Sequence, residues 1–257
     1  MLRRTLWRRS TRKLRPGPDP DFPWLDVGDY LSFPDQKEWH EDIVAIGGNL
    51  SPGMLLSAYE QGIFPWYGPG DPVIWQSPDP RFVIFPGKLH VSSSMRKILN
   101  KKTFDITFDK DFEGVIRGCA EVYRPGQGGA ARQSGAVQQS RTWISNDIIK
   151  AYTELYRLGF AHSVEAWQDG TLAGGCYGIM MSKVFVGESM FAKKNNASKA
   201  AFLTLAEALF ENGFAFIDCQ TPTKHLASLG GEEISRKDFL ALLEKNEVTR
   251  FQPSLPL

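Results

Sequence analysis

The stretch FAFIDCQTPTKHLASLGG, residues 214–231, decides how the second half of this chain is interpreted. Its first four residues, Phe214 to Ile217, form a short apolar run that is typical of a buried strand. Because side chains alternate along a strand, Asp218 and Gln220 are expected on one face and Cys219 on the other. A carboxylate and an amide side by side at the end of an apolar strand indicate a polar ligand.

The cysteine offers an alternative, a thiol nucleophile with His225 as its base. The expected alternation turns Cys219 away from Asp218, and no partner that would orient His225 follows in the sequence. The sequence therefore favours the carboxylate and the amide over a thiol mechanism.

The segments before and after this stretch predict an α+β protein. Helical spacing, with capping residues or glycine stops, predicts helices at 51–62, 90–102, 145–159, 196–213 and 235–245. Strand patterns occur at 103–109 and 183–191, and Asp169-Gly170 marks a hairpin within 162–180. The order strand, hairpin, strand, helix, strand, helix predicts a sheet with helices packed on it.

Composition divides the chain into three parts. Residues 1–18 form a basic tail that we expect to be disordered. Residues 19–80, rich in turn residues and aromatics, form a small N-terminal domain, and residues 81–257 form a larger domain. Within the larger domain, residues 123–141 are low in apolar side chains and predict a flexible loop.

Charge is unevenly distributed over the 257 residues. Residues 1–16 carry seven Arg or Lys and no acid, which leaves 23 basic against 29 acidic residues in the rest of the chain. The tail is a basic arm for nucleic acid, a transit-like peptide or a solvated extension, and we favour the extension. An acidic body needs a local basic patch to bind nucleic acid.

Several classes of protein are disfavoured by the sequence. No apolar run approaches the roughly 20 residues of a transmembrane helix, so we expect a cytoplasmic protein without membrane contact. The three cysteines and four histidines lack metal-ligand spacing, so no metal site is expected. No phosphate loop, dinucleotide fingerprint or nucleophile elbow occurs.

Three further groups of residues each have a functional and a structural interpretation. Six basic residues between Arg81 and Lys102 either contact phosphates or form a solvated helix face. Glu188, in an apolar strand, either is solvated at the strand end or meets a charged partner in a pocket. Aromatic residues in and around the turns either stack on unpaired bases or pack in the core; they are Phe64, Trp66, Tyr67, Trp75 and Trp143.

Four blocks together resemble one family. They are FPWYGPGDPVIWQSPDPR (64–81), LHVSSSMRK (89–97), VGESMFAKKNNASKAA (186–201) and FIDCQTPTKHLASLGG (216–231). In this combination and order they resemble the leucyl/phenylalanyl-tRNA–protein transferases, over about residues 40–245. The resemblance implies a catalytic domain similar to the GCN5-related N-acetyltransferase fold, with a smaller N-terminal α+β domain packed on it.

The resemblance also implies an activity. Members transfer Leu or Phe, and Met less well, from charged tRNA to proteins or peptides with N-terminal Arg or Lys, which creates an N-degron for proteolysis. We expect a monomer that uses no cofactor, because the aminoacyl ester is already activated. The junction SMFAKKNNASKA lacks the Gly-rich loop that holds coenzyme A in acetyltransferases, which fits a donor carried on tRNA.

The resemblance implies site residues by position. Asp218, Gln220 and Glu188 match catalytic and amine-recognition residues, and Trp66 and Trp143 match the aromatics at the terminal adenosine. The donor side-chain pocket is implied at Cys176, Phe185, Met190 and Phe202, and tRNA backbone contacts at Arg96, Lys97, Lys101 and Lys102. The sequence departs from the family at Ser93, where a basic residue is expected, and at Cys176, where Met is expected.

A mechanism follows from these roles. Asp218 would hold the acceptor amine and draw off its proton, directly or through a relay. Gln220 would orient that proton path or donate to the developing oxyanion, and Glu188 would pair with the basic side chain of the acceptor. Two rivals are a coenzyme-A-dependent acyltransferase and a non-catalytic RNA-binding module. A related specificity, Leu onto acidic N-termini, is a third possibility.

Overall fold

A computed structural model describes residues 14–36, 41–122 and 142–250 of the chain. In chain order the elements are β1 (Ile43–Ile46), α1 (Pro52–Glu60), β2 (Phe64–Pro65), β3 (Ile74–Gln76), β4 (Arg81–Ile84), α2 (Ser93–Asn100), β5 (Asp105–Phe108), α3 (Phe112–Glu121), α4 (Asn146–Arg157), β6 (Ala161–Gln168), β7 (Thr171–Met181), β8 (Val184–Ala192), α5 (Ala197–Glu211), β9 (Phe216–Asp218), α6 (Lys224–Ala227), β10 (Glu232–Ile234) and α7 (Arg236–Lys245). Helices and a largely antiparallel sheet confirm the α+β class.

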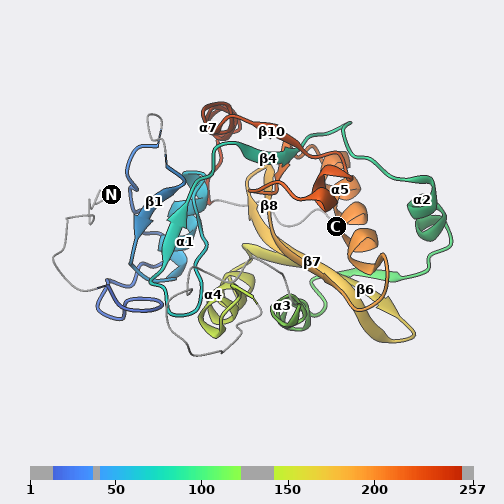
Figure 1. The fold of residues 1–257 in the computed structure, drawn as a ribbon, viewed down its shortest axis with the longest axis horizontal. Helices are drawn as coiled ribbons and strands as arrows, with labels where there is room; N and C mark the ends of the chain where they lie inside the picture. The colour runs from blue at the N-terminus through green and yellow to red at the C-terminus, as the bar shows by residue number, and fades with distance from the viewer. Residues whose placement is uncertain (1–13, 37–40, 123–141, 251–257) are drawn as a thin grey trace.

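The larger sheet has the strand order β10-β4-β9-β8-β7-β6-β5. Helix α5 covers one face, and α3 and α4 cover the other (Figure 1). Two clusters of buried apolar side chains follow these faces, one around α5 and one around α3 and α4. Among the described strands, β8 and β9 are the one parallel pair, and they are joined by the crossover helix α5.

The first part of the chain forms a smaller sheet of order β1-β3-β2 beside helix α1 (Figure 1). Its apolar residues belong to the same buried cluster as those of α3, α4 and α7. Helix α1 therefore packs between the small sheet and the face of the large sheet that carries α4. This packing brings residues of the first 80 positions to the middle of β8, where Tyr59 contacts Glu188.

Most predicted helices and the hairpin are confirmed. Ser92, Ser145 and Ser235 cap α2, α4 and α7 through their side chains, and the residues Asp169 and Gly170 both adopt positive φ at the hairpin turn. Helices α3 and α6 and the edge strands β1 and β10 were not predicted. The strands and α6 are too short to show a clear period, whereas α3 does place its apolar residues at helical spacing and was overlooked.

The proposed division into domains remains a prediction. Residues 1–13 of the predicted tail and the predicted loop 123–141 lie outside the described residues, as do residues 251–257. The described part of the tail contacts the small sheet, where the Gly17 backbone N–H donates to the Asp71 carbonyl at 2.8 Å.

The expected alternation after Phe216 is wrong. Strand β9 ends at Asp218, and Gln220 adopts a left-handed conformation with φ 58°. A residue in that conformation no longer follows the two-residue period of a strand. Cys219 and Gln220 therefore both face the pocket described below, whereas Asp218 does not.

Candidate active site

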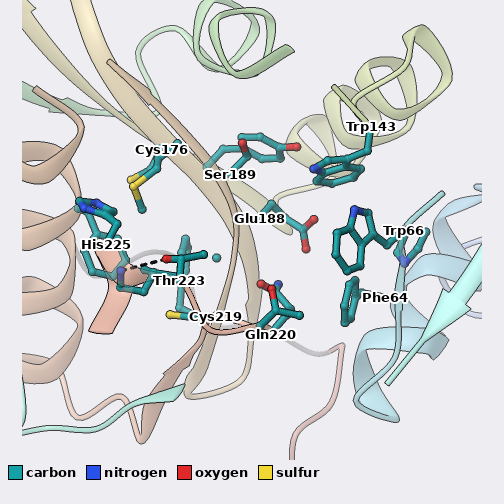
Figure 2. Close-up of a pocket in the computed structure, with 18 residues that line it drawn as sticks. Phe64, Trp66, Trp143, Cys176, Glu188, Ser189, Cys219, Gln220, Thr223 and His225 are labelled. Carbon is teal, nitrogen blue, oxygen red and sulfur yellow. Dashed lines mark hydrogen bonds between the residues drawn. The ribbon is translucent and has the colours of Figure 1, made fainter. Parts of the chain in front are cut away.

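A pocket of about 310 Å³ opens where β8 and β9 stop pairing. The last paired residues are Val186 and Asp218, and beyond them the two chains separate. The pocket is lined by Gly187 to Met190 of β8 and by Cys219 to Thr221 after β9, together with aromatic residues from the small sheet (Figure 2). Its volume is at the lower end of the range for small-molecule sites, about 300–1,000 Å³.

Glu188 projects into this pocket because of a β-bulge. Gly178 of β7 pairs with Gly187, and Tyr177 pairs with Ser189, so Glu188 has no partner across the strand. An extra residue in one strand re-aims its side chain, and such bulges often occur beside active sites. The bulge is a local device that strand periodicity does not predict.

The Glu188 carboxylate contacts two tyrosines that come from two neighbouring helices, α1 and α4. The Tyr59 hydroxyl of α1 donates to Oε1 at 2.6 Å, and the Tyr152 hydroxyl of α4 donates to Oε2 at 3.2 Å. The two tyrosine hydroxyls also hydrogen-bond each other. Burial raises the pKa of Glu188 to about 7, although the two hydroxyls act in the opposite direction.

Asp218 has a different environment, since its carboxylate is paired with an arginine. Arg81 donates from Nε to Oδ1 at 2.8 Å and from Nη2 to Oδ2 at 2.6 Å, and both side chains are buried. Arg81 also donates to the Gly62 carbonyl at 3.0 Å and lies over the Phe239 ring. This bidentate pair joins β4, β9 and the end of α1.

Gln220 lines the pocket, and Asp218 shapes the turn that presents it. The Gln220 backbone N–H donates to Asp218 Oδ1 at 3.0 Å, and its carbonyl accepts from the Phe82 N–H at 3.1 Å. An aspartate that accepts from the N–H two residues on stabilises a turn of this kind. Asp218 therefore contacts Gln220 through the backbone and does not reach the pocket with a free oxygen.

The predicted aromatic residues separate into two groups. Trp66 and Trp143 both line the pocket and lie near each other along one side of it, with Phe64 next to Trp66 (Figure 2). Trp75 is fully buried in the small domain core, where its indole N–H donates to the Gly47 carbonyl, and Tyr67 is also buried. The stacking interpretation thus fits three of the five residues, and core packing fits the other two.

The four residues implied for the donor side chain all line the same pocket; they are Cys176, Phe185, Met190 and Phe202. Cys176 and Met190 face each other across β7 and β8. Phe202 reaches the pocket from α5. These side chains give one end of the pocket an apolar wall.

Cys219 and His225 also line this end of the pocket. Burial raises the pKa of the Cys219 thiol, and the nearby Asp218 adds to this effect, so the thiol stays protonated near neutral pH. Burial lowers the pKa of His225. The thiol mechanism is therefore disfavoured by protonation, and not by the side-chain direction that the sequence suggested.

The predicted basic residues do not line the pocket. Arg96, Lys97, Lys101 and Lys102 are exposed on and after α2, which packs against α5. Arg81, the first residue of the basic segment, is only 1% exposed and belongs to the Asp218 pair. Including Arg81 among the possible phosphate contacts was therefore wrong, because its guanidinium is not accessible.

The described part of the chain offers neither a metal site nor a membrane-spanning helix. Within it, no group of three or more His, Cys, Asp or Glu side chains is arranged to hold a metal ion. None of the helices in the same residues is long and apolar enough to cross a membrane.

Sequence reasoning missed three residues of the site: Tyr59, Tyr152 and Arg81. Tyr152 fitted the apolar period of its helix, and Tyr59 lay within a predicted helix. Nothing in their local sequence distinguishes a tyrosine that binds a carboxylate from one that fills a core. Their partners are 129, 36 and 137 residues away in the chain.

Comparison with known proteins identifies the class and then the family. A family model described as "Leucyl/phenylalanyl-tRNA protein transferase" matches residues 83–244, and a model of the N-terminal domain of the same proteins matches residues 48–79. These matches place the chain among the aminoacyltransferases. More particularly, the chain belongs to the leucyl/phenylalanyl-tRNA–protein transferase family.

Curated relatives carry the same family name. A protein of Syntrophobacter fumaroxidans is 47% identical over 225 residues, which cover 87% of this chain and 91% of the relative. A protein of Flavobacterium johnsoniae is 48% identical over 215 residues, covering 83% and 96% respectively. A protein of Nitrosospira multiformis is 49% identical over 203 residues, covering 79% and 82%.

Proposed function

We propose that this protein transfers Leu or Phe, and Met less well, from charged tRNA to proteins with N-terminal Arg or Lys, and so creates an N-degron. The observation that carries the proposal is one pocket with three kinds of wall: apolar, aromatic and acidic. An aminoacyl-adenosine with a basic acceptor needs these three surfaces. We propose that the protein acts as a monomer in the cytoplasm.

The donor would occupy the apolar and aromatic walls. Trp66 and Trp143 would hold the terminal adenosine by stacking, since every base has a π-face. The Leu or Phe side chain would enter the end formed by Cys176, Phe185 and Phe202. Apolar pockets separate side chains by only about 1–3 kcal/mol per methylene, which fits the use of more than one donor.

The acceptor would be recognised by Glu188. Its described hydrogen-bond partners are the neutral hydroxyls of Tyr59 and Tyr152, so no cation neutralises it at close range. A desolvated carboxylate favours a partner of opposite charge, which selects Arg or Lys and penalises neutral residues. The same carboxylate repels an acidic N-terminus, which argues against the reverse specificity.

The reaction needs a neutral α-amine, and the amine nitrogen attacks the ester carbonyl carbon. The bond from that carbon to the ribose oxygen breaks, the amine loses a proton and the ribose oxygen gains one. No ATP is required, because the ester is already activated. The protein's task is therefore placement, proton transfer and stabilisation of the oxyanion.

Gln220 would take a direct part in this chemistry, and Asp218 an indirect one. Gln220 is the one that lines the pocket, so its amide would donate to the oxyanion or orient the proton path. Direct contact of Asp218 with the amine would require a free oxygen, and both oxygens are bound by Arg81. We therefore assign Asp218 the indirect role, in which it holds the turn of Gln220.

Two other features support the proposal. The parallel strands β8 and β9 separate at the pocket, next to a bulge in β8, which is compatible with the GCN5-related N-acetyltransferase likeness of the catalytic domain. The exposed Arg96, Lys97, Lys101 and Lys102 offer phosphate contacts for the acceptor end of tRNA.

The test is a transfer assay. Purified protein is incubated with Leu-tRNA and with peptides that begin with Arg, Lys, Asp or Glu, and mass spectrometry detects the addition of one leucine. Transfer to the Arg and Lys peptides alone is expected. Transfer to none of the four, or equal transfer from leucyl-coenzyme A, would overturn the proposal, and tRNA binding without transfer would indicate an RNA-binding module.

A further inference from the structure

Arg250 lies after α7 and is bound on all sides by the N-terminal part of the chain. Its backbone N–H donates to Glu60 Oε1 at 2.7 Å, its Nε to the same oxygen at 3.1 Å, and its Nη2 to Glu60 Oε2 at 2.7 Å. Nη2 also donates to Ser57 Oγ at 2.9 Å. Nη1 donates to the Val27 carbonyl at 2.7 Å and to the carbonyl of Asp29.

These contacts use the whole guanidinium group. An arginine side chain has five N–H donors in a rigid fork, and each of the five has an acceptor here. Arg250 is only 6% exposed. A buried arginine with every donor satisfied and a bidentate carboxylate fixes its partners in one arrangement.

The partner that matters for the site is Glu60, the last residue of α1. The residue before it is Tyr59, whose hydroxyl donates to Glu188 at 2.6 Å. Neighbouring residues on a helix point about 100° apart, so Glu60 faces Arg250 while Tyr59 faces Glu188. A shift of the helix end that loosens one contact therefore moves the other.

The end of α1 is held from a second direction as well. The Gly62 carbonyl, two residues after Glu60, accepts a hydrogen bond from Arg81, which is paired with Asp218. Arg250 and Arg81 thus hold the end of this helix against two different parts of the chain. Tyr59, which donates to Glu188, directly precedes these two points of attachment.

We propose that Arg250 is a positioning residue for the acceptor site: it fixes the end of α1 through Glu60, so that Tyr59 holds the Glu188 carboxylate in the orientation that binds a basic N-terminal residue. The proposal rests on the function proposed above and adds a determinant of acceptor affinity far from the pocket in sequence. It concerns the acceptor, because the contacts lead from Arg250 through Glu60 and the adjacent Tyr59 to Glu188.

The main experiment measures Arg250→Gln with both substrates. We expect the KM for an Arg-initiated peptide to rise about tenfold at saturating Leu-tRNA, which is a typical coupling between connected sites. The KM for Leu-tRNA at saturating peptide should stay within about twofold. Equal rises in both constants would contradict the proposal.

A matched control separates positioning from general stability. Arg236 is also buried, and it joins α7 to the Glu41 carbonyl at 2.9 Å and to Asp79, which both lie outside α1. Arg236→Gln should lower the melting temperature without changing the ratio of the two KM values. The same change of that ratio in both variants would mean that Arg250 acts only on stability.

A double-mutant cycle tests the route through Tyr59. If Arg250 acts through this tyrosine, Arg250→Gln should have little further effect on the peptide KM in a Tyr59→Phe background. Additive effects would overturn the proposal. Should Arg250→Gln not fold, Arg250→Lys replaces it: the ammonium keeps the charge but cannot span Glu60 and the two carbonyls, and an unchanged peptide KM would then overturn the proposal.

The pKa of Glu188 can be measured without any transfer reaction, so it tests this inference separately from the proposed function. Glu188 can be titrated by NMR of 13C-labelled glutamate side chains, with Glu188→Gln as the assignment control. Four groups face this carboxylate: Tyr59, Tyr152, Asp218 and Arg81. Since the Tyr59 hydrogen bond lowers the pKa of Glu188, Arg250→Gln should raise the midpoint. An unchanged midpoint overturns the inference, whereas absence of transfer by the wild type overturns the function alone.

Discussion

Two buried carboxylates lie on the neighbouring parallel strands β8 and β9, and the partners of the two carboxylates differ. Asp218 at the end of β9 is neutralised by Arg81 in a buried bidentate pair. Among the described residues, the hydrogen bonds of Glu188, in the bulge of β8, come from two tyrosine hydroxyls. The comparison teaches that a buried charge with a permanent partner maintains the fold, whereas one without such a partner is available to a charged substrate.

The largest effect should come from breaking the Asp218 pair. Asp218→Asn keeps the shape of the side chain but leaves the Arg81 guanidinium without a counter-charge, and loss of one partner of a buried pair costs about 3–5 kcal/mol of unfolding free energy. Urea denaturation of the wild type and the variant measures this loss of unfolding free energy. The exposed pair of Glu113 and Arg117 is the control, since Glu113→Gln should cost no more than about 1 kcal/mol. Equal losses in both variants would refute the comparison.

The second effect concerns activity rather than stability. Glu188→Gln should leave the unfolding free energy nearly unchanged, because burial already disfavours the ionised form. Transfer to an Arg peptide should fall about 100-fold, as is typical for the loss of a catalytic or recognition carboxylate. For a peptide that begins with citrulline, the neutral analogue of arginine, the same substitution should reduce transfer much less. A large loss of unfolding free energy would instead show that Glu188, like Asp218, maintains the fold.

The third effect is a pH dependence. With its pKa raised to about 7, Glu188 is ionised above that value, so the preference for Arg over citrulline should rise through about pH 7 and level off above it. Burial raises the pKa values of Tyr59 and Tyr152 well above 10, so these hydroxyls stay neutral in that range. The ratio of kcat/KM for the two peptides cancels the titration of their amines. A flat ratio would contradict the prediction.

The smallest effect should come from the longer of the two tyrosine contacts. Tyr152→Phe removes the 3.2 Å hydrogen bond to Glu188 Oε2, which stabilises the ionised form. The midpoint of the peptide ratio should therefore move up by about half to one pH unit, or roughly 1 kcal/mol. Tyr156→Phe is a matched control on the same helix, since its hydroxyl donates to the Asp109 carbonyl. A downward shift of the midpoint would contradict a stabilising role of the Tyr152 hydroxyl.

Much of the site was predictable residue by residue. Glu188 and Gln220 both line the pocket, as do the two tryptophans and the four residues implied for the donor side chain. The assignment of their chemical roles remains a proposal. The helices were predictable as well, because serine caps and the 3.6-residue period are local properties.

The errors came from treating residues 216–220 as one continuous strand. Strand periodicity holds only while the chain is extended, and here it ends at Asp218. Arg81 was grouped with surface lysines for a related reason. Net charge along a sequence does not reveal whether a guanidinium reaches solvent, and this one is covered by Phe239 and bound to Asp218.

By itself the sequence determined the α+β class, most helices, the hairpin turn and the presence of two carboxylates on apolar strands, since these depend on neighbours within a few residues. Only the tertiary structure decided which carboxylate is neutralised and which is left for a substrate. Arg81 is 137 residues from Asp218, and Tyr59 is 129 residues from Glu188. Contacts over such separations depend on how α1 and the two sheets pack together, and no local pattern encodes that packing.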